Sequence, residues 1–449
     1  MITTAMTGRL VERGDAGWRA ATQAFDLTVT QEPALVALPA TDDDVVAIVD
    51  FARERGLQIA PQRTGHNAKP LGSLDDVVLV RTDALQGVEL DLERRVARVR
   101  AGARWADVVP RASAFGLAAL HGSTPDVSVA GYALGGGVGW YARKHGLAAN
   151  SVAAIELVTA DGRLRRVDHD HDPDLFWALR GGGGNFGLVT TIEIQLYPVA
   201  EVYAGMAFFP WERSSEVLHT WLEWAATVPD EVTSVGRILQ IPPLPHLPAE
   251  LRGRQFAAVD AVVLGDERLG RELLEPLRRL GPEVDTFTTR PPAGIAELHM
   301  DPQQPVPGVT DSVMLGDLPG EAIDRFVAAV GPGSGSRLLV ADVRQLGGAL
   351  RRPRAHHGAL STLDASFVSF GVGMGRDEAT RAASHERLAR LNDALTPYDT
   401  GRRYLNFADR PTDPARFFTP DAYRRLRAAK AAVDPDGLFR ANHPIPPAR

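Results

Sequence analysis

Cysteine is absent from this chain of 449 residues. Its absence excludes disulfide bonds, thiolate metal sites, iron–sulfur clusters and cysteine nucleophiles. Long apolar runs are also missing, because no stretch approaches the ~20 residues that cross a bilayer. The first 14 residues, MITTAMTGRLVERG, lack the charged-then-apolar order of a secretory signal. We therefore expect no membrane partner, and the cytoplasm is the predicted location.

The chain has no excess of positive charge. Its formal net charge is −7 and its isoelectric point is near 6.0. No basic surface is available to neutralise phosphates, so we expect no nucleic-acid partner. One run, Asp168 to His171, has metal-like residue types, but it lies between a predicted hairpin and a predicted helix. That position favours a solvated turn and predicts no metal site.

The first third of the chain alternates between strand and helix patterns. Residues 41–56 predict a helix, with Thr41 as its cap, three aspartates in the first turn and Gly56 at its end. Residues 151–168 predict a hairpin with a type I′ turn at Asp161-Gly162. Asp172 and Pro173 mark the start of another helix. Further strands are expected at 32–40, 57–62, 76–81, 95–102 and 188–199, and a helix at 104–116.

The composition of the loops changes after about residue 200, where proline-rich connectors replace glycine-rich loops. The patterns predict strands at 337–346 and 365–374 and helices at 380–397 and 422–434. The length suits two or three domains at ~100–200 residues each. We assign one cofactor domain to residues 1–200, a substrate domain to 201–400, and a C-terminal segment to 401–449.

Three segments are unusually rich in glycine. They are PQRTGHNAKPLGS (61–73), HGSTPDVSVAGYALGGGVGWYARKHGLAAN (121–150) and LRGGGGNFGLVTTIEI (179–194). Glycine on a turn lets backbone N–H groups approach a phosphate. The GYALGGGVG pattern of the second segment is not the dinucleotide GxGxxG followed by a helix and a ribose-binding acid, and it lacks the GK[ST] of a P-loop, so a nicotinamide or ATP site is not supported. Each segment, taken alone, is also compatible with a purely structural loop.

A fourth segment, YLNFAD (404–409), is followed by NHPIP (442–446) near the C-terminus. On an extended strand Tyr404 and Asn406 share one face. The phenol of Tyr404 is a candidate acid or base, with a structural tyrosine as the alternative. We expect His299 to be a histidine on a loop. Arg344 or Gln345 can contact a substrate from a predicted strand.

The ordered motifs RTGHNA, TPDVSVAGYALGGGVG, LFWALRGGGGNFGLVT, YLNF and VDPDGLFRANHPI resemble one family. They are similar to the flavin-linked oxidases of the vanillyl-alcohol oxidase/p-cresol methylhydroxylase (PCMH) type. Within that type they resemble the berberine-bridge-like branch, which includes bacterial 6-hydroxynicotine oxidase and antibiotic-tailoring oxidases. The resemblance implies an α+β fold. It has a PCMH-type FAD-binding domain of two α/β subdomains and a substrate domain with an antiparallel sheet covered by helices. The C-terminal segment then returns to the FAD domain.

The resemblance also implies a role for individual positions. His66 matches the histidine that binds the flavin covalently, and Thr124 stands where many relatives carry a cysteine for a second link. Without cysteine, only the link through His66 is possible. Val127 matches the position where a small side chain admits oxygen. The other expected FAD-binding residues are Arg63, Thr64, Gly65, Asn67, Gly72, Pro125, Asp126, Val129, Ala130, Gly131, Tyr132, Gly135, Gly136, Gly137, Gly139, Asn150, Val189, Tyr404, Asn406 and Asn442.

The implied activity is hydride transfer from a small-molecule substrate to covalently bound FAD. The substrate is an alcohol, a sugar, an amine or a secondary metabolite, and O2 reoxidises the flavin to give H2O2. Tyr404 is the main predicted acid or base, because Phe407 replaces the second tyrosine of many relatives. Tyr132 and His121 are the other catalytic candidates. A dehydrogenase or oxidative cyclase of the same fold, and a non-catalytic flavin-binding protein, are the alternatives. Substrate identity and oligomeric state are left open.

Overall fold

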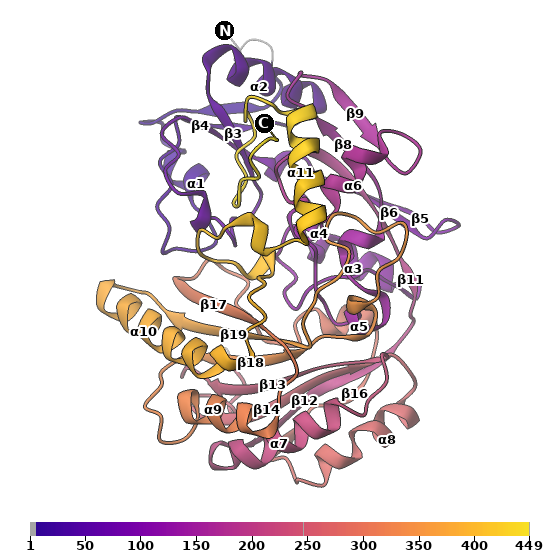
Figure 1. The fold of residues 1–449 in the computed structure, drawn as a ribbon, viewed down its shortest axis with the longest axis vertical. Coiled ribbons are helices and arrows are strands. Elements are labelled where there is room, and N and C mark those ends of the chain that lie inside the picture. The colour runs from indigo at the N-terminus through magenta and orange to yellow at the C-terminus, as the bar shows by residue number, and fades with distance from the viewer. Residues whose placement is uncertain (1–5, 246, 449) are drawn as a thin grey trace.

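The computed structural model describes residues 6–245 and 247–448. Residues 1–5, part of the segment considered for an export signal, lie outside the described residues. Figure 1 shows the molecule in two parts, with the N-terminal strands and the C-terminal helix together at one end and a large sheet with its helices at the other. Within the described residues, no helix combines the length and the hydrophobicity needed to cross a membrane.

A small sheet opens the fold. Its order is β1-β2-β4-β3; β2, β4 and β3 pair in parallel, while β1 is antiparallel to β2. Helix α2 covers it and begins as the sequence predicts. Thr41 Oγ1 accepts the Asp44 N–H at 3.1 Å, the Asp44 carboxylate accepts the Thr41 N–H at 3.1 Å, and Gly56 ends the helix at φ +64°. The elements are β1 (Arg9–Val11), α1 (Trp18–Thr22), β2 (Leu35–Leu38), α2 (Asp42–Arg55), β3 (Gln58–Gln62), η2 (Lys69–Leu71), β4 (Val77–Arg81) and η3 (Thr82–Ala84).

A second, antiparallel sheet follows in the order β5-β6-β10-β8-β9. The β8–β9 hairpin is present, but its turn is not the type I′ turn that was predicted. Only Gly162 has a positive φ there (+78°), and the loop spans 159–163 because Val158 pairs with Leu164. The elements are β5 (Val88–Asp91), β6 (Val96–Arg100), α3 (Trp105–Ser113), β7 (Leu117–Ala118), α4 (Val129–Leu134), α5 (Ala142–His145), η4 (Ala148–Ser151), β8 (Val152–Val158), β9 (Leu164–Val167), α6 (Pro173–Gly182), β10 (Leu188–Gln195) and β11 (Tyr197–Pro198).

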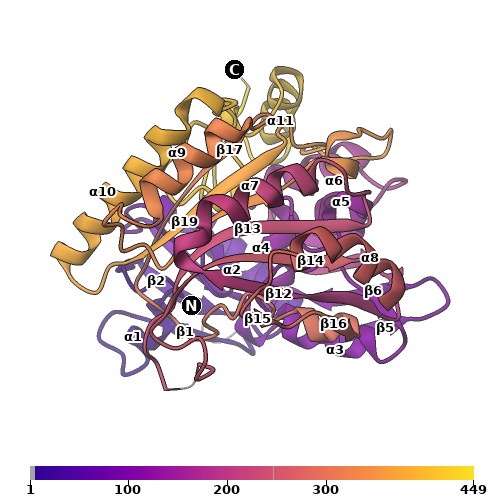
Figure 2. The same cartoon turned by 90° about the horizontal axis from the view of Figure 1, so that it is seen from below.

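The large antiparallel sheet has the order β15-β12-β14-β13-β18-β19-β17, with β16 also paired to β12. Helices α7, α8, α9 and α10 cover its outer face, as Figure 2 shows from below. The other face points toward the N-terminal part. The elements are β12 (Val202–Pro210), η5 (Trp211–Arg213), α7 (Ser214–Ala225), β13 (Val232–Gln240), β14 (Gln255–Val263), α8 (Glu267–Arg278), β15 (Val284–Asp285), β16 (Thr288–Arg290), η6 (Pro292–Ile295), β17 (Gly308–Leu315), α9 (Gly320–Val330), β18 (Val340–Gln345), η7 (Gly348–Arg351), β19 (Phe367–Met374) and α10 (Glu378–Leu395).

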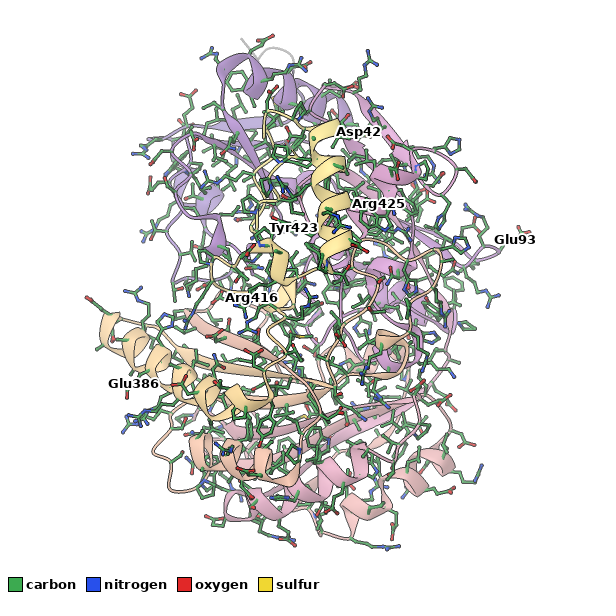
Figure 3. All side chains as sticks on the ribbon, viewed as in Figure 1. Asp42, Glu93, Glu386, Arg416, Tyr423 and Arg425 are labelled. Atoms are coloured by element: carbon green, nitrogen blue, oxygen red, sulfur yellow. The ribbon has the colours of Figure 1, made fainter. Side chains whose placement is uncertain are left out.

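The C-terminal segment returns to the N-terminal part. It contains η8 (Thr396–Tyr398), η9 (Leu405–Phe407), η10 (Pro414–Arg416) and α11 (Pro420–Val433). Helix α11 packs on α6, where Arg425 bonds Asp174 at 2.7 Å and stacks over Trp177 (Figure 3). Beyond the helix, Phe439 forms a parallel bridge with Ile59 at the edge of β3. The tail thereby becomes part of the first sheet.

Two further local predictions are wrong, although the α+β class is confirmed. Residues 129–134, taken as part of a glycine loop, form the short helix α4, whose cap Ser128 accepts the Gly131 N–H at 3.3 Å. Residues 405–407 form a 3₁₀ turn rather than an extended strand. Tyr404 and Asn406 meet nonetheless, because the turn brings Asn406 Nδ2 within 3.2 Å of the Tyr404 hydroxyl.

Candidate functional site

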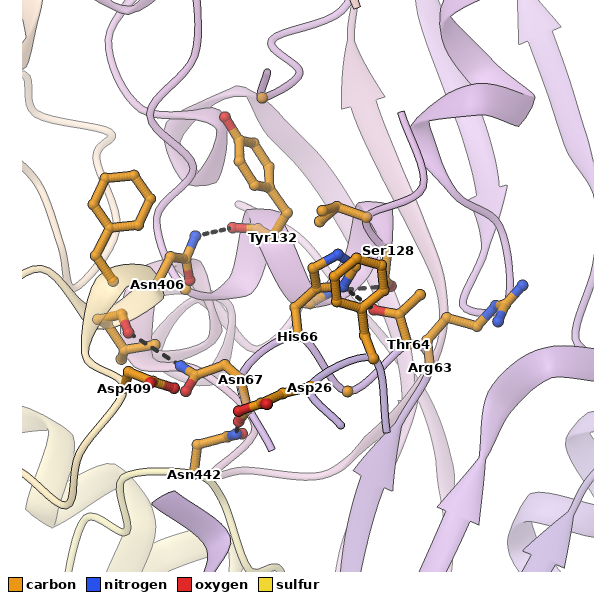
Figure 4. Close-up of a pocket in the computed structure, with 18 of the residues that line it drawn as sticks. Asp26, Arg63, Thr64, His66, Asn67, Ser128, Tyr132, Asn406, Asp409 and Asn442 are labelled. Atoms are coloured by element: carbon orange, nitrogen blue, oxygen red, sulfur yellow. Dashed lines mark hydrogen bonds between the residues drawn. The ribbon is translucent and has the colours of Figure 1, made fainter. Parts of the chain in front are cut away.

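A cavity of about 480 Å³ lies between the N-terminal part and the inner face of the large sheet. The three glycine segments, the 404–409 segment and the C-terminal tail all contribute to its wall. Strands β13, β17, β18 and β19 close it from the other side. The sequence motifs, although separated by up to 380 residues, therefore converge on one place, as Figure 4 shows in close-up.

Most of the predicted FAD-binding residues line this cavity. They are Arg63, Thr64, Gly65, His66, Asn67, Val127, Ala130, Gly131, Tyr132, Gly135, Val189, Asn406 and Asn442. The remaining predicted residues lie behind the wall or away from it. They are Gly72, Pro125, Asp126, Val129, Gly136, Gly137, Gly139, Asn150 and Tyr404, together with His121.

His66 is held rigidly in the wall. Its ring stacks on Phe25 with centroids 3.7 Å apart and planes 14° apart. Nδ1 lies 2.7 Å from the Thr64 hydroxyl, and Nε2 lies 3.4 Å from the Asp126 carboxylate without a hydrogen bond. Asp126 thus reaches the site through His66 rather than from the wall. These contacts on three sides fix the orientation of the imidazole, and Figure 4 shows His66 beside Thr64.

The segments around His66 are tied together by amide side chains. Asn406 Nδ2 donates to the Tyr132 carbonyl at 3.0 Å, and Asn67 Nδ2 donates to the Leu405 carbonyl at 3.3 Å. Asn442 donates to the Asn67 carbonyl, which joins the C-terminal tail to the histidine turn (Figure 4). Asn185, which the sequence left without a role, holds the tail by accepting the Ile445 N–H at 2.8 Å.

Tyr404 does not face the cavity, and the catalytic role predicted for it is not supported by its position. Its hydroxyl accepts the Val138 N–H at 2.9 Å. Burial raises its pKa above the ordinary value, and the bonds from backbone N–H groups only partly offset this. A phenol in this state remains protonated at neutral pH, and its hydrogen bond from Val138 holds the second glycine segment in place.

His121 is likewise buried away from the cavity. Burial lowers its pKa to about 4, so the ring is neutral. Its Nδ1 bonds the Gly122 carbonyl at 2.6 Å, and the ring packs against Trp105 and Tyr141. Its predicted catalytic role therefore lacks a path to a substrate. Tyr132 differs, because its hydroxyl is buried in the cavity wall and has no hydrogen-bond partner within the described protein.

The other displaced residues have structural roles. Asn150 binds the loop at 358–361, donating to the Ser361 carbonyl at 3.2 Å and accepting the Gly358 N–H at 2.8 Å. It does not line the cavity. At Gly139 an added Cβ would lie 1.8 Å from the His121 carbonyl oxygen. This glycine permits close packing of the second segment rather than contact with a ligand.

The sequence missed several polar residues of the site. Asp409 lines the cavity and pairs with Lys69 at 3.3 Å, and burial raises its pKa to about 6. Asp301 lines it too, accepting hydrogen bonds from Ser123 at 3.1 Å and Thr124 at 2.8 Å. The only sequence signal for such residues is a charge within an otherwise apolar or proline-rich stretch, which singles out no partner.

His299 lies in a turn between η6 and β17, as the sequence favoured, and it is buried there. It is 5% exposed and packs edge-on against Trp140. Its Nε2 lies 2.9 Å from Asp260 Oδ2, within ion-pair distance but outside hydrogen-bond geometry. Burial lowers its pKa well below 6.5, so this histidine is neutral.

The cavity fits an FAD molecule. Its glycine segments expose main chain, and Gly65 and Gly183 adopt φ of +77° and +70°, which turns their backbone in a way that side-chain-bearing residues rarely allow. Buried polar atoms without protein partners, namely His66 Nε2, Asn67 Oδ1 and Tyr132 OH, belong to wall residues. Backbone N–H groups for a pyrophosphate and orphaned polar atoms for a polar ring system are the donor set that FAD needs.

Comparison with known proteins agrees with this fit. A family model described as an FAD binding domain matches residues 33–168, and one described as berberine and berberine like matches residues 403–446. The chain is 29% identical to (R)-6-hydroxynicotine oxidase of Paenarthrobacter nicotinovorans over 458 positions, which cover 98% of this chain and 97% of that protein. Xylooligosaccharide oxidase of Thermothelomyces thermophilus is 34% identical over 213 positions, 46% of this chain and 43% of the relative.

A solved structure shares the whole fold. Physcomitrella patens BBE-like 1 superposes with a TM-score of 0.86, at 20% identity, over 100% of this chain and 99% of the other. This likeness establishes the PCMH-type architecture, while the sequence matches establish the cofactor. The chain carries an FAD binding domain and a berberine-like C-terminal segment, and it is an FAD-linked oxidoreductase similar to the berberine-bridge-like oxidases.

Proposed function

We propose that the protein oxidises a small-molecule substrate with FAD linked covalently to His66, and that O2 reoxidises the cofactor to give H2O2. When bound, FAD supplies the hydride-accepting chemistry. The observation that carries the proposal is the fixed imidazole of His66 in the wall of a glycine-lined cavity. A histidine that only stabilised the fold would not need a buried nitrogen without a partner.

The protein's own residues have distinct tasks in this proposal. The turn at 63–67 and the segment at 125–139 hold the cofactor, and Asn442 closes the turn from the C-terminal tail. Tyr132 lines the cavity, but its hydroxyl is fully buried near Gly122 and Gly139 and has no hydrogen-bond partner within the described protein. Burial raises its pKa well above 10, so at neutral pH it donates a proton in a hydrogen bond rather than removing one.

The covalent link is tested by denaturing the purified protein and precipitating it. Yellow colour that stays with the polypeptide, and that is released into the supernatant in His66→Ala, supports the link. Thr64→Val serves as a matched variant, because it removes the hydroxyl 2.7 Å from Nδ1 but leaves the imidazole. It is expected to slow the linkage without abolishing it. Flavin that leaves the wild-type chain on denaturation would contradict the proposal.

The electron acceptor is tested separately. Val127, the position that the resemblance connects with oxygen access, lines the cavity and supports O2 as the acceptor. A turning-over substrate under air is expected to yield one H2O2 for each product. Turnover without peroxide would favour the alternative of a same-fold dehydrogenase or oxidative cyclase.

The substrate class follows only broadly from the relatives, whose names specify 6-hydroxynicotine and xylooligosaccharides. We propose a small alcohol, sugar, amine or secondary metabolite, to be identified by anaerobic flavin bleaching across these classes. The third alternative, a non-catalytic flavin-binding protein, predicts that none of these substrates bleaches the flavin.

A further inference from the structure

The inner face of the large sheet carries four charged side chains in an otherwise apolar surface. They are Arg237 on β13, Asp260 on β14, and Asp342 and Arg344 on β18. Asp260 and Asp342 are 0% exposed and Arg237 is 2% exposed. Charges buried this deeply destabilise a fold unless they are paired, and apolar residues of similar size stabilise it as well or better. Their presence beside a cavity therefore points to a role in binding.

The four side chains form one alternating chain of charges. Arg237 Nη1 bonds Asp260 Oδ2 at 2.9 Å, and Arg237 Nε lies 4.0 Å from Asp342 Oδ2. Arg344 completes the series by donating hydrogen bonds to the Asp342 carboxylate from Nε at 3.2 Å and from Nη2 at 3.0 Å. The order across the three strands is Asp260, Arg237, Asp342, Arg344. Only the two arginines reach the cavity wall.

Arg344 ends this chain at the cavity, between two aromatic rings. Its guanidinium carbon lies 5.3 Å from the centre of the Phe370 ring and 5.1 Å from that of Phe407, and both rings line the cavity. Its Nη1 makes no hydrogen bond within the described protein, whereas Arg237 Nε is fully buried and lies 4.0 Å from Asp342 Oδ2. Arg344 therefore offers N–H donors to a ligand that lies against the two aromatic rings.

The positive charges around these donors are already matched. Two arginines face two aspartates, and Asp301 gives the cavity wall one carboxylate in excess. Burial raises the pKa of Asp260 to about 6 even though Arg237 beside it acts to lower that pKa. His299 next to it is neutral and adds no positive charge. An anionic ligand would therefore find no unpaired cation in the cavity to balance its charge. A neutral oxygen acceptor would accept hydrogen bonds from the free N–H groups and add no charge.

We propose that the cavity takes an uncharged planar ring compound whose hydrogen-bond-accepting oxygen binds Arg344 between Phe370 and Phe407, and that it discriminates against carboxylates. Arg344 is then a specificity-determining residue, and the three charges behind it are positioning residues. The inference rests on the proposed function only in taking this cavity as the substrate site.

Three probes of nearly the same shape separate charge from size: benzamide, benzoate and benzamidinium. They carry charges of 0, −1 and +1, and their binding to the purified holoprotein is measured by titration calorimetry. We expect benzamide to bind at least ~10-fold more tightly than either charged probe. Benzoate or benzamidinium binding as tightly as benzamide, or no benzamide binding at up to ~50 mM, would overturn the proposal.

Variants connect the preference to Arg344. Arg344→Lys keeps the positive charge beside Asp342 but loses the planar fork, and we expect ~5-fold or greater weakening of benzamide binding. Arg337→Lys is the matched control, because Arg337 is exposed just before the same strand and is expected to leave binding unchanged. Unchanged benzamide binding in Arg344→Lys would overturn the assignment.

A second variant guards against misfolding. Arg344→Met combined with Asp342→Leu removes both partners, so that no buried charge is left alone, and is expected to abolish the preference for benzamide over benzoate. Flavin content is measured on every sample by absorbance. A colourless protein that still shows the benzamide preference would contradict the proposed function but not this inference, and a yellow protein without the preference would do the reverse.

Discussion

Asp409 is a carboxyl group that the fold holds in an unfavourable environment. Burial raises its pKa from near 3.8 to about 6, and Lys69 offsets this only in part. The folded state therefore binds this proton more tightly than the unfolded state does. Between about pH 4 and pH 6 the unfolded chain loses the proton first, so stability falls as the pH rises through this window.

The prediction concerns Asp409→Asn. Wild type is expected to lose up to about 3 kcal/mol of unfolding free energy through this group between pH 4 and pH 7, and the variant lacks that loss. Urea unfolding of both proteins at the two pH values measures the difference. An identical pH dependence in the two proteins would show that the carboxyl is not held in the protonated form.

Tyr404 illustrates how burial changes the role of a residue type. The Tyr404→Phe variant leaves the Val138 N–H without its acceptor. We expect a loss of about 1–3 kcal/mol in unfolding free energy, with turnover per bound flavin little changed. Urea unfolding and turnover normalised to flavin content measure the two effects.

The control for that variant is Tyr423→Phe, on α11, where no hydrogen bond of the hydroxyl is present within the described protein. It is expected to change stability by less than ~0.5 kcal/mol. A large fall in turnover per flavin in Tyr404→Phe, with stability unchanged, would restore the catalytic role that the sequence suggests.

At the scale of elements, helix α4 and the turn after it show why the glycines recur. An added Cβ at Gly135 would lie 1.8 Å from Asn406 Oδ1, which is anchored by its bond to the Tyr132 carbonyl. At Gly131, one turn earlier in the same helix, the nearest atom would be 3.8 Å away, on Ser128. Packing between elements therefore requires glycine at position 135, but it does not require glycine at position 131.

These two glycines give a matched pair of variants. Gly135→Ala is expected to destabilise the flavin-free protein by about 1–3 kcal/mol, because the C-terminal segment has to shift. Gly131→Ala is expected to stay within ~0.5 kcal/mol of wild type, since alanine suits a helix and meets no close atom. Thermal unfolding of flavin-free protein measures both. Equal effects at the two positions would remove the packing argument.

Elements with strong local signals were predictable, and those decided by neighbours were not. Helix α2 carries its cap, its acidic first turn and its final glycine in consecutive residues, so the sequence predicts it. The six residues of α4 have no such length, and surrounding contacts stabilise them instead. The turn type predicted for residues 159–163 was wrong for a similar reason, because a one-residue difference in strand pairing changes the turn type.

At the scale of the whole molecule, Arg143 on α5 joins the two parts. It is buried and donates to the Val232 carbonyl at 2.7 Å and the Leu346 carbonyl at 2.5 Å, both in the part built around the large sheet. The adjacent Lys144 pairs with Glu231 at the surface at 2.5 Å. Two neighbouring cations thus cross the same boundary, one buried and one exposed.

Burial determines how much each of the two cations contributes to the free energy of unfolding. Arg143→Met leaves buried carbonyls unpaired and is expected to lower the unfolding free energy by about 2–4 kcal/mol. Lys144→Met removes an exposed pair and is expected to cost about 1 kcal/mol or less. Urea unfolding compares the two, and a Lys144 variant as unstable as the Arg143 variant would argue against the buried junction.

The sequence by itself determined the α+β class and the likeness to FAD-linked oxidases, because glycine turns, caps and ordered motifs are encoded in short runs of neighbouring residues. It also placed His66, Asn67, Asn406 and Asn442 in what proved to be one cavity wall. The tertiary structure decided which polar groups face that cavity. Pairing of β14, β13 and β18 assembles the buried charges, and close packing turns Tyr404 away from the cavity while Tyr132 faces it. These outcomes depend on strand register and burial, which arise between segments far apart in the chain and which no single segment encodes.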